Sequence, residues 1–305
     1  MSNTAIITDS NSGISVKEGQ SLGVAVVPMP VHIDGKIFYE GLDLTQPKFY
    51  DALRKGASVS TSQPSPADVV AVWNRVLRDH REAVYIPMSA GLSGSCQMAS
   101  LMAREYDGRV QVADNRRISV PQRYAVLDAL RMAEEGRGAA EIRQTLEAEG
   151  PDNCVYITAD TLRYLRKGGR VTGVEAVAGS MLNIKPVMEI RSEKLTAIGK
   201  ARGMKSARRL MLQKVREDFD GRLKPLADAG QLRVLIAYSE IPRSLLNDWR
   251  AEVQAAFPEQ TEIFAEPLTL SIACHSGPGA LAVGAVRVPG SADVNQGLNM
   301  ERGAH

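Results

Sequence analysis

Short apolar segments that each end at a polar residue and are followed by a helix-like stretch constrain this fold most strongly. Three of them stand out: residues 4–8 before Asp9, residues 83–88 before Ser89, and residues 110–113 before Asp114. Buried strands that alternate with helices are typical of a parallel sheet with helices on its faces. Because ligands bind beyond the carboxyl ends of such strands, we expect these polar residues to gather at one rim.

Prolines indicate where the first half departs from a regular sheet. Residues 24–33 are extended, but Pro28 and Pro30 each remove a backbone donor, so we expect an edge or linking strand rather than a central one. Residues 60–66 are interpreted as a turn, with Ser65 as the N-cap of the helix that follows. Further helices are expected over 97–105 and 122–135, and in the second half over about 203–219 and 242–256.

The length of 305 residues favours two domains, because a single core rarely grows to that size. We predict an α/β fold with an N-terminal parallel-sheet, Rossmann-like domain over 1–150, a second α/β domain over 151–288 and a flexible tail over 289–305, with the ligand between the two domains. Strands of the second domain are expected at 155–158, 184–190, 195–199, 232–238, 261–265 and 280–287. Residues 191–194 join two of them at hairpin spacing, so this sheet should be mixed.

Composition argues against several classes of protein. Lys plus Arg (37) nearly balances Asp plus Glu (35) and aromatics are 5%, so nucleic acid is not an expected partner. The three cysteines are far apart in the sequence, which favours reduced thiols over a disulfide or a metal site. The N-terminus lacks a signal-peptide pattern, and no run of about 18 apolar residues is present, so we expect a cytoplasmic protein.

Two segments are rich in hydroxyl groups or glycine. In Thr61-Ser62-Gln63-Pro64-Ser65, helix capping explains Ser65 but not Thr61 and Ser62, whose hydroxyls can donate to a carboxylate or phosphate. In residues 88–95, glycines allow backbone N–H groups to face an anion, while Ser93 adds a hydroxyl. Both segments are therefore candidates for binding an anionic group.

Three interpretations of residues 88–95 stay open. The segment matches neither a Walker loop nor a dinucleotide fingerprint. It also departs from the nucleophile elbow, because Gly91-Leu92-Ser93-Gly94-Ser95 ends in Ser where Gly is required. A plain strand-to-helix turn, an anion site and a nucleophilic Ser93 are the alternatives.

Basic residues beyond residue 160 supply further candidates. A helix is expected over 161–166, with Gly168 as its C-cap. A C-cap explains only one glycine, and a second glycine followed by Arg170 is less usual at the end of a helix. Arg170 can make a bidentate contact to an oxyanion, so a structural and a functional interpretation both stay open. Arg202 taken alone would be an exposed surface charge.

His275 and two aspartates have structural and functional interpretations. His275 is one of four histidines and is expected in a turn before a strand, either satisfied by backbone groups or acting as a tunable donor to an anion. Asp9 and Asp114 raise the possibility of a metal pair, but carboxylates at strand ends more often cap the next turn. We therefore predict neither a metal site nor a cofactor.

Taken together, these segments resemble the DegV family of bacterial fatty acid-binding proteins. The matches occur in family order over about residues 4–287. They are Asp9-Ser10, Val27-Pro28, Asp34-Gly35-Lys36, Tyr39, Thr61-Ser62-Gln63-Pro64-Ser65, Leu92-Ser93-Gly94, residues 162–170 (LRYLRKGGR), Leu182-Asn183-Ile184-Lys185-Pro186, Arg202 and His275-Ser276-Gly277-Pro278-Gly279. Each motif alone is weak, but the series is specific. The chain departs from the family pattern at Ser95-Cys96, Gly13-Ile14 and Gly203.

The resemblance implies a carrier rather than an enzyme. Members of this family enclose a long acyl tail between two α/β domains, and the better-understood ones present the carboxylate to a separate ATP-dependent kinase that forms an acyl phosphate. By motif, Thr61, Ser62, Ser93 and Gly94 would hold the carboxylate, while Arg170, Arg202 and His275 would serve the carboxylate or phosphate region. Transient contact with a membrane is compatible with this role.

Two other functions are alternatives. One is a serine-dependent acyl hydrolase or acyltransferase that uses Ser93 and His275, although no third triad member is evident in the sequence. The other is a lipid-responsive interaction protein without a phosphorylated product. Acyl chain length and the partner's identity depend on pocket shape and surface, which the sequence does not give.

Overall fold

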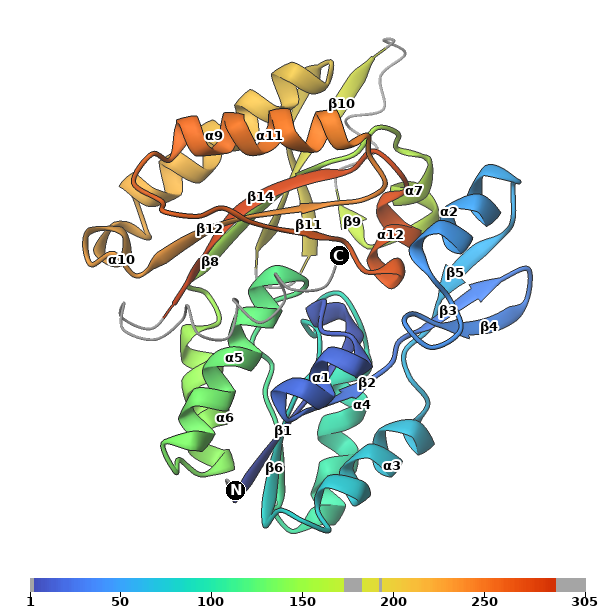
Figure 1. The fold of residues 1–305 in the computed structure, drawn as a ribbon, viewed down its shortest axis with the longest axis vertical. Helices are drawn as coiled ribbons and strands as arrows, with labels where there is room; N and C mark the ends of the chain where they lie inside the picture. The colour runs from blue at the N-terminus through green and yellow to red at the C-terminus, as the bar shows by residue number, and fades with distance from the viewer. Residues whose placement is uncertain (1–2, 173–182, 192–193, 289–305) are drawn as a thin grey trace.

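The computed structural model describes residues 3–172, 183–191 and 194–288. Two large sheets lie one above the other, with a small third sheet beside them (Figure 1). In the described part of the chain, the strands of the two large sheets fall on either side of Gly150, and we propose the boundary between 150 and 151 on this ground. The predicted tail, 289–305, lies outside the described residues.

The N-terminal sheet is parallel, as predicted. Its strands are β1 (Thr4–Asp9), β2 (Val24–Val27), β6 (Glu82–Ile86) and β7 (Val110–Val112), in the order β2-β1-β6-β7. Every residue of β1 is buried because helices cover both faces of the sheet. One face packs against α1 (Val16–Leu22), α5 (Val120–Glu134) and α6 (Ala139–Glu149), and the other against α3 (Pro66–Val76) and α4 (Ser95–Met102).

The second sheet is mixed, again as predicted. Its strands are β8 (Asn153–Thr158), β9 (Val171–Thr172), β10 (Ile184–Arg191), β11 (Lys194–Arg202), β12 (Leu232–Tyr238), β13 (Phe264–Pro267) and β14 (Leu281–Arg287), in the order β13-β12-β14-β8-β10-β11-β9. The expected hairpin is the antiparallel β10–β11 pair; residues 192 and 193 lie outside the described part. The β12–β13 and β11–β9 pairs are parallel.

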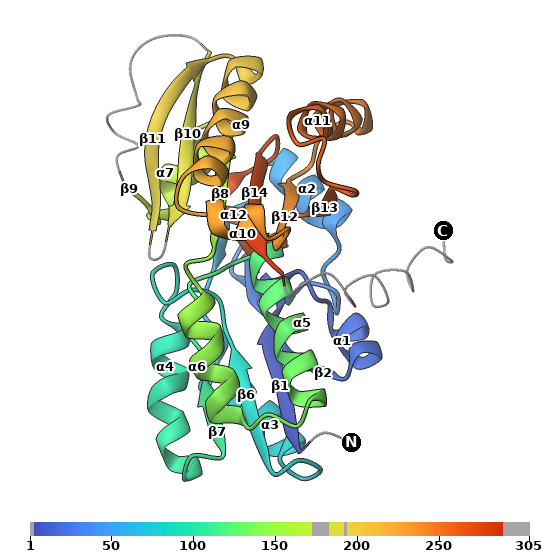
Figure 2. The same cartoon turned by 90° about the vertical axis from the view of Figure 1, so that its left-hand side faces the viewer.

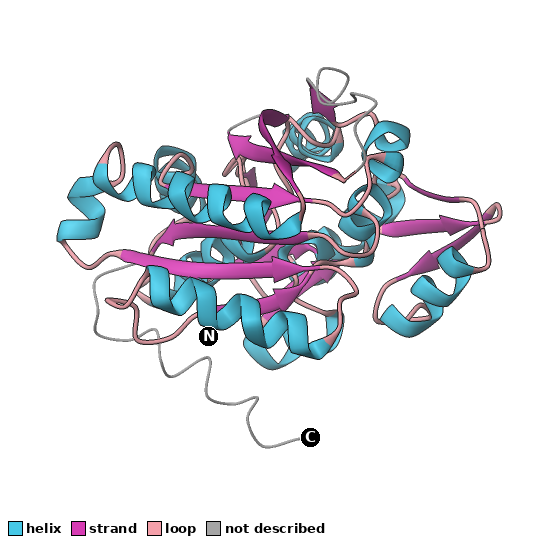
Figure 3. Ribbon diagram, turned by 90° about the horizontal axis from the view of Figure 1, so that it is seen from above, coloured by secondary structure: helices cyan, strands magenta, loops and turns pink. Residues whose placement is uncertain are grey.

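Helices pack against both faces of this mixed sheet. The outer face packs against α9 (Met204–Asp220) and α11 (Arg243–Ala256), with α10 (Lys224–Asp228) at one end (Figure 1). Seen from above, helices lie alongside the strands (Figure 3). The inner face meets Val120 and Tyr124 of α5, so this helix contacts both large sheets (Figure 2). The space between the sheets therefore has a packed wall on each side.

The small sheet corrects one expectation. It comprises β3 (Pro30–Ile33), β4 (Lys36–Tyr39) and β5 (Val59–Thr61), in the order β4-β3-β5. Residues 24–33 thus split into β2, an edge strand as expected, and β3, which is central in its own sheet. Pro30 is tolerated there because it is the first residue of the strand. The small sheet packs against α2 (Gln46–Arg54) and α12 (Leu270–Ser276).

Three local predictions were wrong. Thr61 ends strand β5, so the predicted turn is shorter than 60–66. His275 lies in the last turn of α12, not in a turn before a strand. Gly168 is the last residue of α7 (Arg163–Gly168), and the C-cap is Gly169 with a φ of 65°. By contrast, Ser65 caps α3 as predicted, since its hydroxyl accepts from the Asp68 backbone N–H.

Candidate functional site

Polar groups gather where the parallel strands end, as the strand pattern predicts. The buried Asp9 carboxylate accepts hydrogen bonds from the backbone N–H groups of Met88 (2.8 Å) and Asn11 (3.0 Å). Asp114 accepts from the N–H of Ala90 at 3.3 Å. Burial raises the pKa of Asp9 to about 6, with these hydrogen bonds opposing the shift. Both aspartates therefore hold turns at the rim, the capping role predicted for them.

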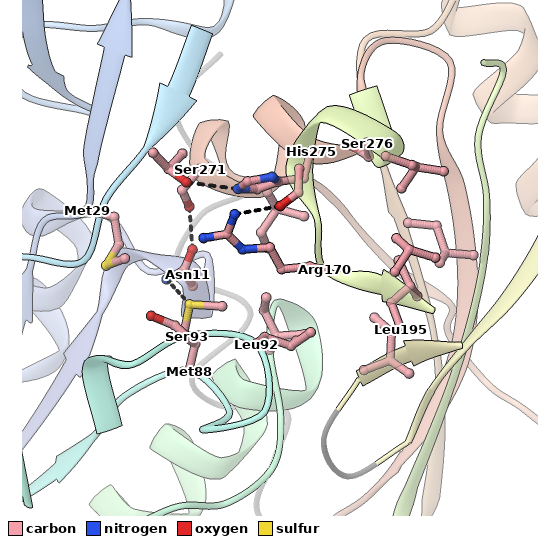
Figure 4. A pocket seen from close by; sticks show the side chains of 18 of the residues that line it. Asn11, Met29, Met88, Leu92, Ser93, Arg170, Leu195, Ser271, His275 and Ser276 are labelled. Atoms are coloured by element: carbon pink, nitrogen blue, oxygen red, sulfur yellow. Dashed lines mark hydrogen bonds between the residues drawn. The ribbon is translucent and has the colours of Figure 1, made fainter. Parts of the chain in front are cut away.

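A pocket of about 110 Å³ lies between the two large sheets, next to the small sheet and α12 (Figure 4). Most of its wall is apolar: Met29, Met88, Leu92, Ile118, Ile157, Leu165, Val171, Ile190, Leu195 and Ile272. Its polar members are Asn11, Thr61, Ser62, Gln63, Ser93, Arg170, Ser271, His275 and Ser276. A largely apolar wall with a few polar groups is typical of small-molecule sites.

One hydrogen bond joins the small sheet to α12 inside this pocket. Thr61 Oγ1 lies 2.8 Å from His275 Nε2. Burial, and then the positive charge of Arg170, lower the pKa of His275 to about 4, so its ring is neutral at neutral pH. A neutral imidazole carries one N–H, so this contact uses His275 either as donor or as acceptor.

The backbone of α7 lies directly against the same ring. A Cβ added at Gly168 would lie only 2.4 Å from His275 Nδ1, closer than side-chain atoms approach one another. Gly168 is thus required by the close approach of the imidazole and not by helix termination. Arg170 donates from Nη1 to the Gly168 carbonyl at 2.5 Å.

A second histidine–hydroxyl pair lies beside the first. Ser62 Oγ is 3.0 Å from Nε2 of His32, on strand β3. Ser62 is exposed although it lines the pocket, which makes this pair part of the pocket's mouth. His32 could not be singled out from the sequence, because its contact with Ser62 depends on the pairing of β3 with β5.

Ser93 lies in the turn between β6 and α4, on the side of the pocket formed by the N-terminal sheet. Its hydroxyl is 2.8 Å from Ser95 Oγ and accepts from the Ser95 backbone N–H at 3.2 Å. Gly94 is the N-cap residue of α4 and does not line the pocket in the described part of the chain. An added Cβ at Gly94 would lie 3.0 Å from the Gln63 side chain, so the two hydroxyl-rich segments are neighbours.

The structure brings together most, but not all, of the residues singled out from the sequence. Thr61, Ser62, Ser93, Arg170 and His275 all line the pocket. Arg202 is the last residue of β11, is exposed, and is absent from the described lining. The three described cysteines are free and buried.

Sequence reasoning missed two lining residues that join the halves of the molecule. Ser271 of α12 donates to the Asn11 side chain, and Asn11 in turn donates to Met88 Sδ at 3.0 Å. Thr269 before an apolar stretch was the available signal for a helix start at 270. The signal is weak because α12 is short and the Leu270 N–H is capped by the distant Glu40 carboxylate.

The described residues contain neither a cluster of metal ligands nor a helix suited to a membrane. No group of three or more His, Cys, Asp or Glu side chains is placed to hold a metal ion there. None of the described helices combines the length and the apolar character that crossing a bilayer requires.

Fold and pocket together define a two-sheet α/β protein with a mainly apolar pocket between a parallel and a mixed sheet. The chain belongs to the DegV family: the family described as "Uncharacterised protein, DegV family" matches residues 3–288. A DegV domain-containing protein of Caldanaerobacter subterraneus is 30% identical over 284 residues, or 93% of this chain and 98% of its own. One from Deinococcus radiodurans is 36% identical over 67% of this chain and 73% of its own.

Solved structures of the family are similar over nearly the whole chain. A fatty acid-binding DegV family protein from Thermus thermophilus is 32% identical, with a TM-score of 0.82 over 94% of this chain and 100% of its own. A fatty acid-binding DegV family protein from Streptococcus agalactiae is 26% identical, with a TM-score of 0.82 over 94% of this chain and 99% of its own. The predicted family and fold class are confirmed.

Proposed function

We propose that this protein binds a long-chain fatty acid, with the carboxylate at Thr61, Ser62 and Ser93 and the tail along the apolar wall. The observation that carries the proposal is a single pocket in which hydroxyl groups from two hydroxyl-rich segments lie next to ten apolar side chains. The similar proteins from Thermus and Streptococcus are fatty acid-binding, which supports the same ligand class here.

The tail is expected to supply most of the affinity. Burying about fourteen methylenes contributes about 11 kcal/mol before the cost of association. Met29 and Met88 line the pocket, and methionine side chains adapt readily because they are unbranched.

The head group is expected to bind through neutral donors. If His275 donates to Thr61, the Thr61 hydroxyl proton is free for a carboxylate oxygen. Ser93 offers a hydroxyl from the opposite side. Arg170 adds a positive charge at the exposed end of the pocket. Hydrogen bonds to a charged group contribute about 1.5–3 kcal/mol each and offset the cost of desolvating the carboxylate.

We propose further that the carboxylate is presented to a separate ATP-dependent fatty acid kinase. Ser62 and Arg170 are exposed, so a head group bound there would be accessible from outside. Arg163, Arg166 and Lys167 of α7 are exposed nearby and suit a phosphate-bearing partner surface. Arg202, outside the described lining, fits this outer role better than carboxylate binding.

The hydrogen-bond pattern favours binding over the serine-hydrolase alternative. A nucleophilic serine needs a base within hydrogen-bond reach. The hydrogen bond of His275 runs to Thr61, while that of Ser93 runs to Ser95. No specific feature favours the lipid-responsive interaction protein over a carrier.

The test measures binding and phosphorylation separately. Mass spectrometry of the purified protein after denaturation should release fatty acid in equimolar amount, and delipidated protein should bind palmitate. A protein free of lipid that binds no palmitate would exclude the proposal. Incubating the loaded protein with a bacterial fatty acid kinase and ATP should yield acyl phosphate; binding without product would leave a carrier but exclude the kinase step.

A further inference from the structure

Two adjacent hydroxyls, that of Thr61 at the end of strand β5 and that of Ser62 directly after it, contact two different histidines. Thr61 pairs with Val31 in the β3–β5 register and shares its face, which is buried against α12. Ser60 pairs with His32, on the opposite face. Because side chains alternate along a strand, Ser62 returns to the side of His32, within the reach of a diagonal neighbour. The 3.0 Å contact between His32 and Ser62 is the result.

The direction of this hydrogen bond determines what Ser62 can offer a ligand. A serine hydroxyl has one proton and two acceptor lone pairs. If His32 accepts, the Ser62 proton points into the ring and only lone pairs face the pocket, which repel an anion. If His32 donates, the Ser62 proton is free for a carboxylate oxygen.

We propose that His32 is a positioning residue of the head-group site, donating from Nε2 to Ser62 Oγ and so turning the Ser62 proton toward an anionic head. This inference rests on the proposed function, because it assumes that a carboxylate binds in the pocket. His32 itself does not line the described pocket, and therefore acts through Ser62. His32 is half-buried. Its neighbours across the sheet, Ile37 and Ser60, are uncharged, so neither forms an ion pair with the ring in competition with the contact to Ser62.

The inference predicts a coupled effect that depends on the charge of the head group. His32→Ala and Ser62→Ala should each weaken palmitate binding about five- to tenfold, the size of one lost hydrogen bond at an exposed site. The double variant should bind no more weakly than the worse single variant, because both remove the same interaction. His32→Gln, which retains an N–H donor, should recover most of the affinity.

Binding of hexadecanol distinguishes a positioning role of His32 from a purely structural role. Its hydroxyl head can either donate or accept, so the direction of the Ser62 proton matters little and His32→Ala should change its affinity less than twofold. His80, bonded to the Val76 carbonyl in the first half of the chain, is the matched control, and His80→Ala should leave both affinities unchanged.

The outcomes are distinct. Losses that multiply in the double variant, equal losses for palmitate and hexadecanol, or a Gln variant no better than Ala would each overturn the role of His32, while palmitate binding by the unmodified protein would leave the proposed function intact. An unmodified protein that binds no palmitate would overturn both.

Discussion

The hydroxyl of Thr61 lies 2.8 Å from Nε2 of His275, although 214 positions separate the two residues in the chain. Thr61 ends β5, and His275 lies in the last turn of α12. The contact therefore holds the small sheet against α12, the helix from which Ser271 donates a hydrogen bond to Asn11. Because the His275 ring is also packed against Gly168, its position depends on three separate segments.

Replacing Gly168 should displace His275. An alanine Cβ would lie 2.4 Å from His275 Nδ1, so either the ring or the end of α7 must move. We expect Gly168→Ala to weaken palmitate binding at least about tenfold, since it breaks the hydrogen bond to Thr61 as well as the packing. Isothermal titration calorimetry measures the effect.

Gly169 provides the control for that substitution. Its φ of 65° is left-handed, but an added Cβ would meet nothing within 4 Å. Gly169→Asn should bind palmitate almost normally, because asparagine tolerates this conformation. Equal losses in the two variants would show that α7 tolerates no side chain here and would contradict the specific role of the imidazole contact.

The ionisation of His275 should make stability depend on pH. Its pKa falls from 6.5 to about 4 on folding, so the unfolded chain binds a proton first as pH decreases. The corresponding stabilisation is complete above pH 6.5 and is lost as pH falls toward 4, by roughly 3 kcal/mol in total. In urea titrations, the advantage of the unmodified protein over His275→Gln should shrink across this window. Groups such as Asp9 titrate in both proteins and cancel, so parallel curves would contradict the shift.

A buried arginine should be important for stability. Arg123 of α5, with 6% of its side chain exposed, bonds to Glu18 of α1 and lies 3.2 Å from Glu266 of β13. Arg123→Met would leave two carboxylates without this partner, and we expect a loss of about 3–5 kcal/mol in the free energy of unfolding. Denaturant titration measures it.

Arg131, on the same helix, is the matched control for Arg123. It forms an i,i+4 pair with Glu135 in which the side chains are 40% and 48% exposed. Arg131→Met should therefore cost less than about 1 kcal/mol. Similar losses at both positions would show that the buried ion cluster contributes no more than a surface pair.

The hydroxyls of Thr61 and Ser93 should both contribute to binding of the head group. Thr61→Val and Ser93→Ala should each weaken palmitate binding, by about tenfold, because a donor to a charged group is lost. Thermal unfolding separates the effect on binding from the effect on stability, because Ser93→Ala also removes the partner of the buried Ser95 hydroxyl at the start of α4. Unaltered palmitate affinity in both variants would place the carboxylate elsewhere in the pocket.

Much of the first half could be predicted because local patterns determine it. The buried run of β1 and the Ser65 cap follow from periodicity and capping rules that involve neighbouring residues only. The rim at Asp9 and Asp114 follows from the rule that parallel strands end at the same edge of a sheet. The small sheet could not be predicted from these local rules, because β3 pairs with β4 and β5 rather than with β2. A proline at the first position of a strand carries no signal of which sheet the strand joins.

By itself, the sequence determined the alternation of strands and helices that predicts a parallel sheet, the hairpin that makes the second sheet mixed, and the hydroxyl-rich segments, since each of these patterns involves residues close together in the chain. Only the tertiary structure decided which side chains meet. It paired Thr61 with His275 and Ser62 with His32, set Gly168 against the imidazole, and left Arg202 outside the described pocket lining. These contacts depend on strand register and on helix packing between segments that lie from 30 to 214 positions apart, and neither is encoded in a local pattern of residue types.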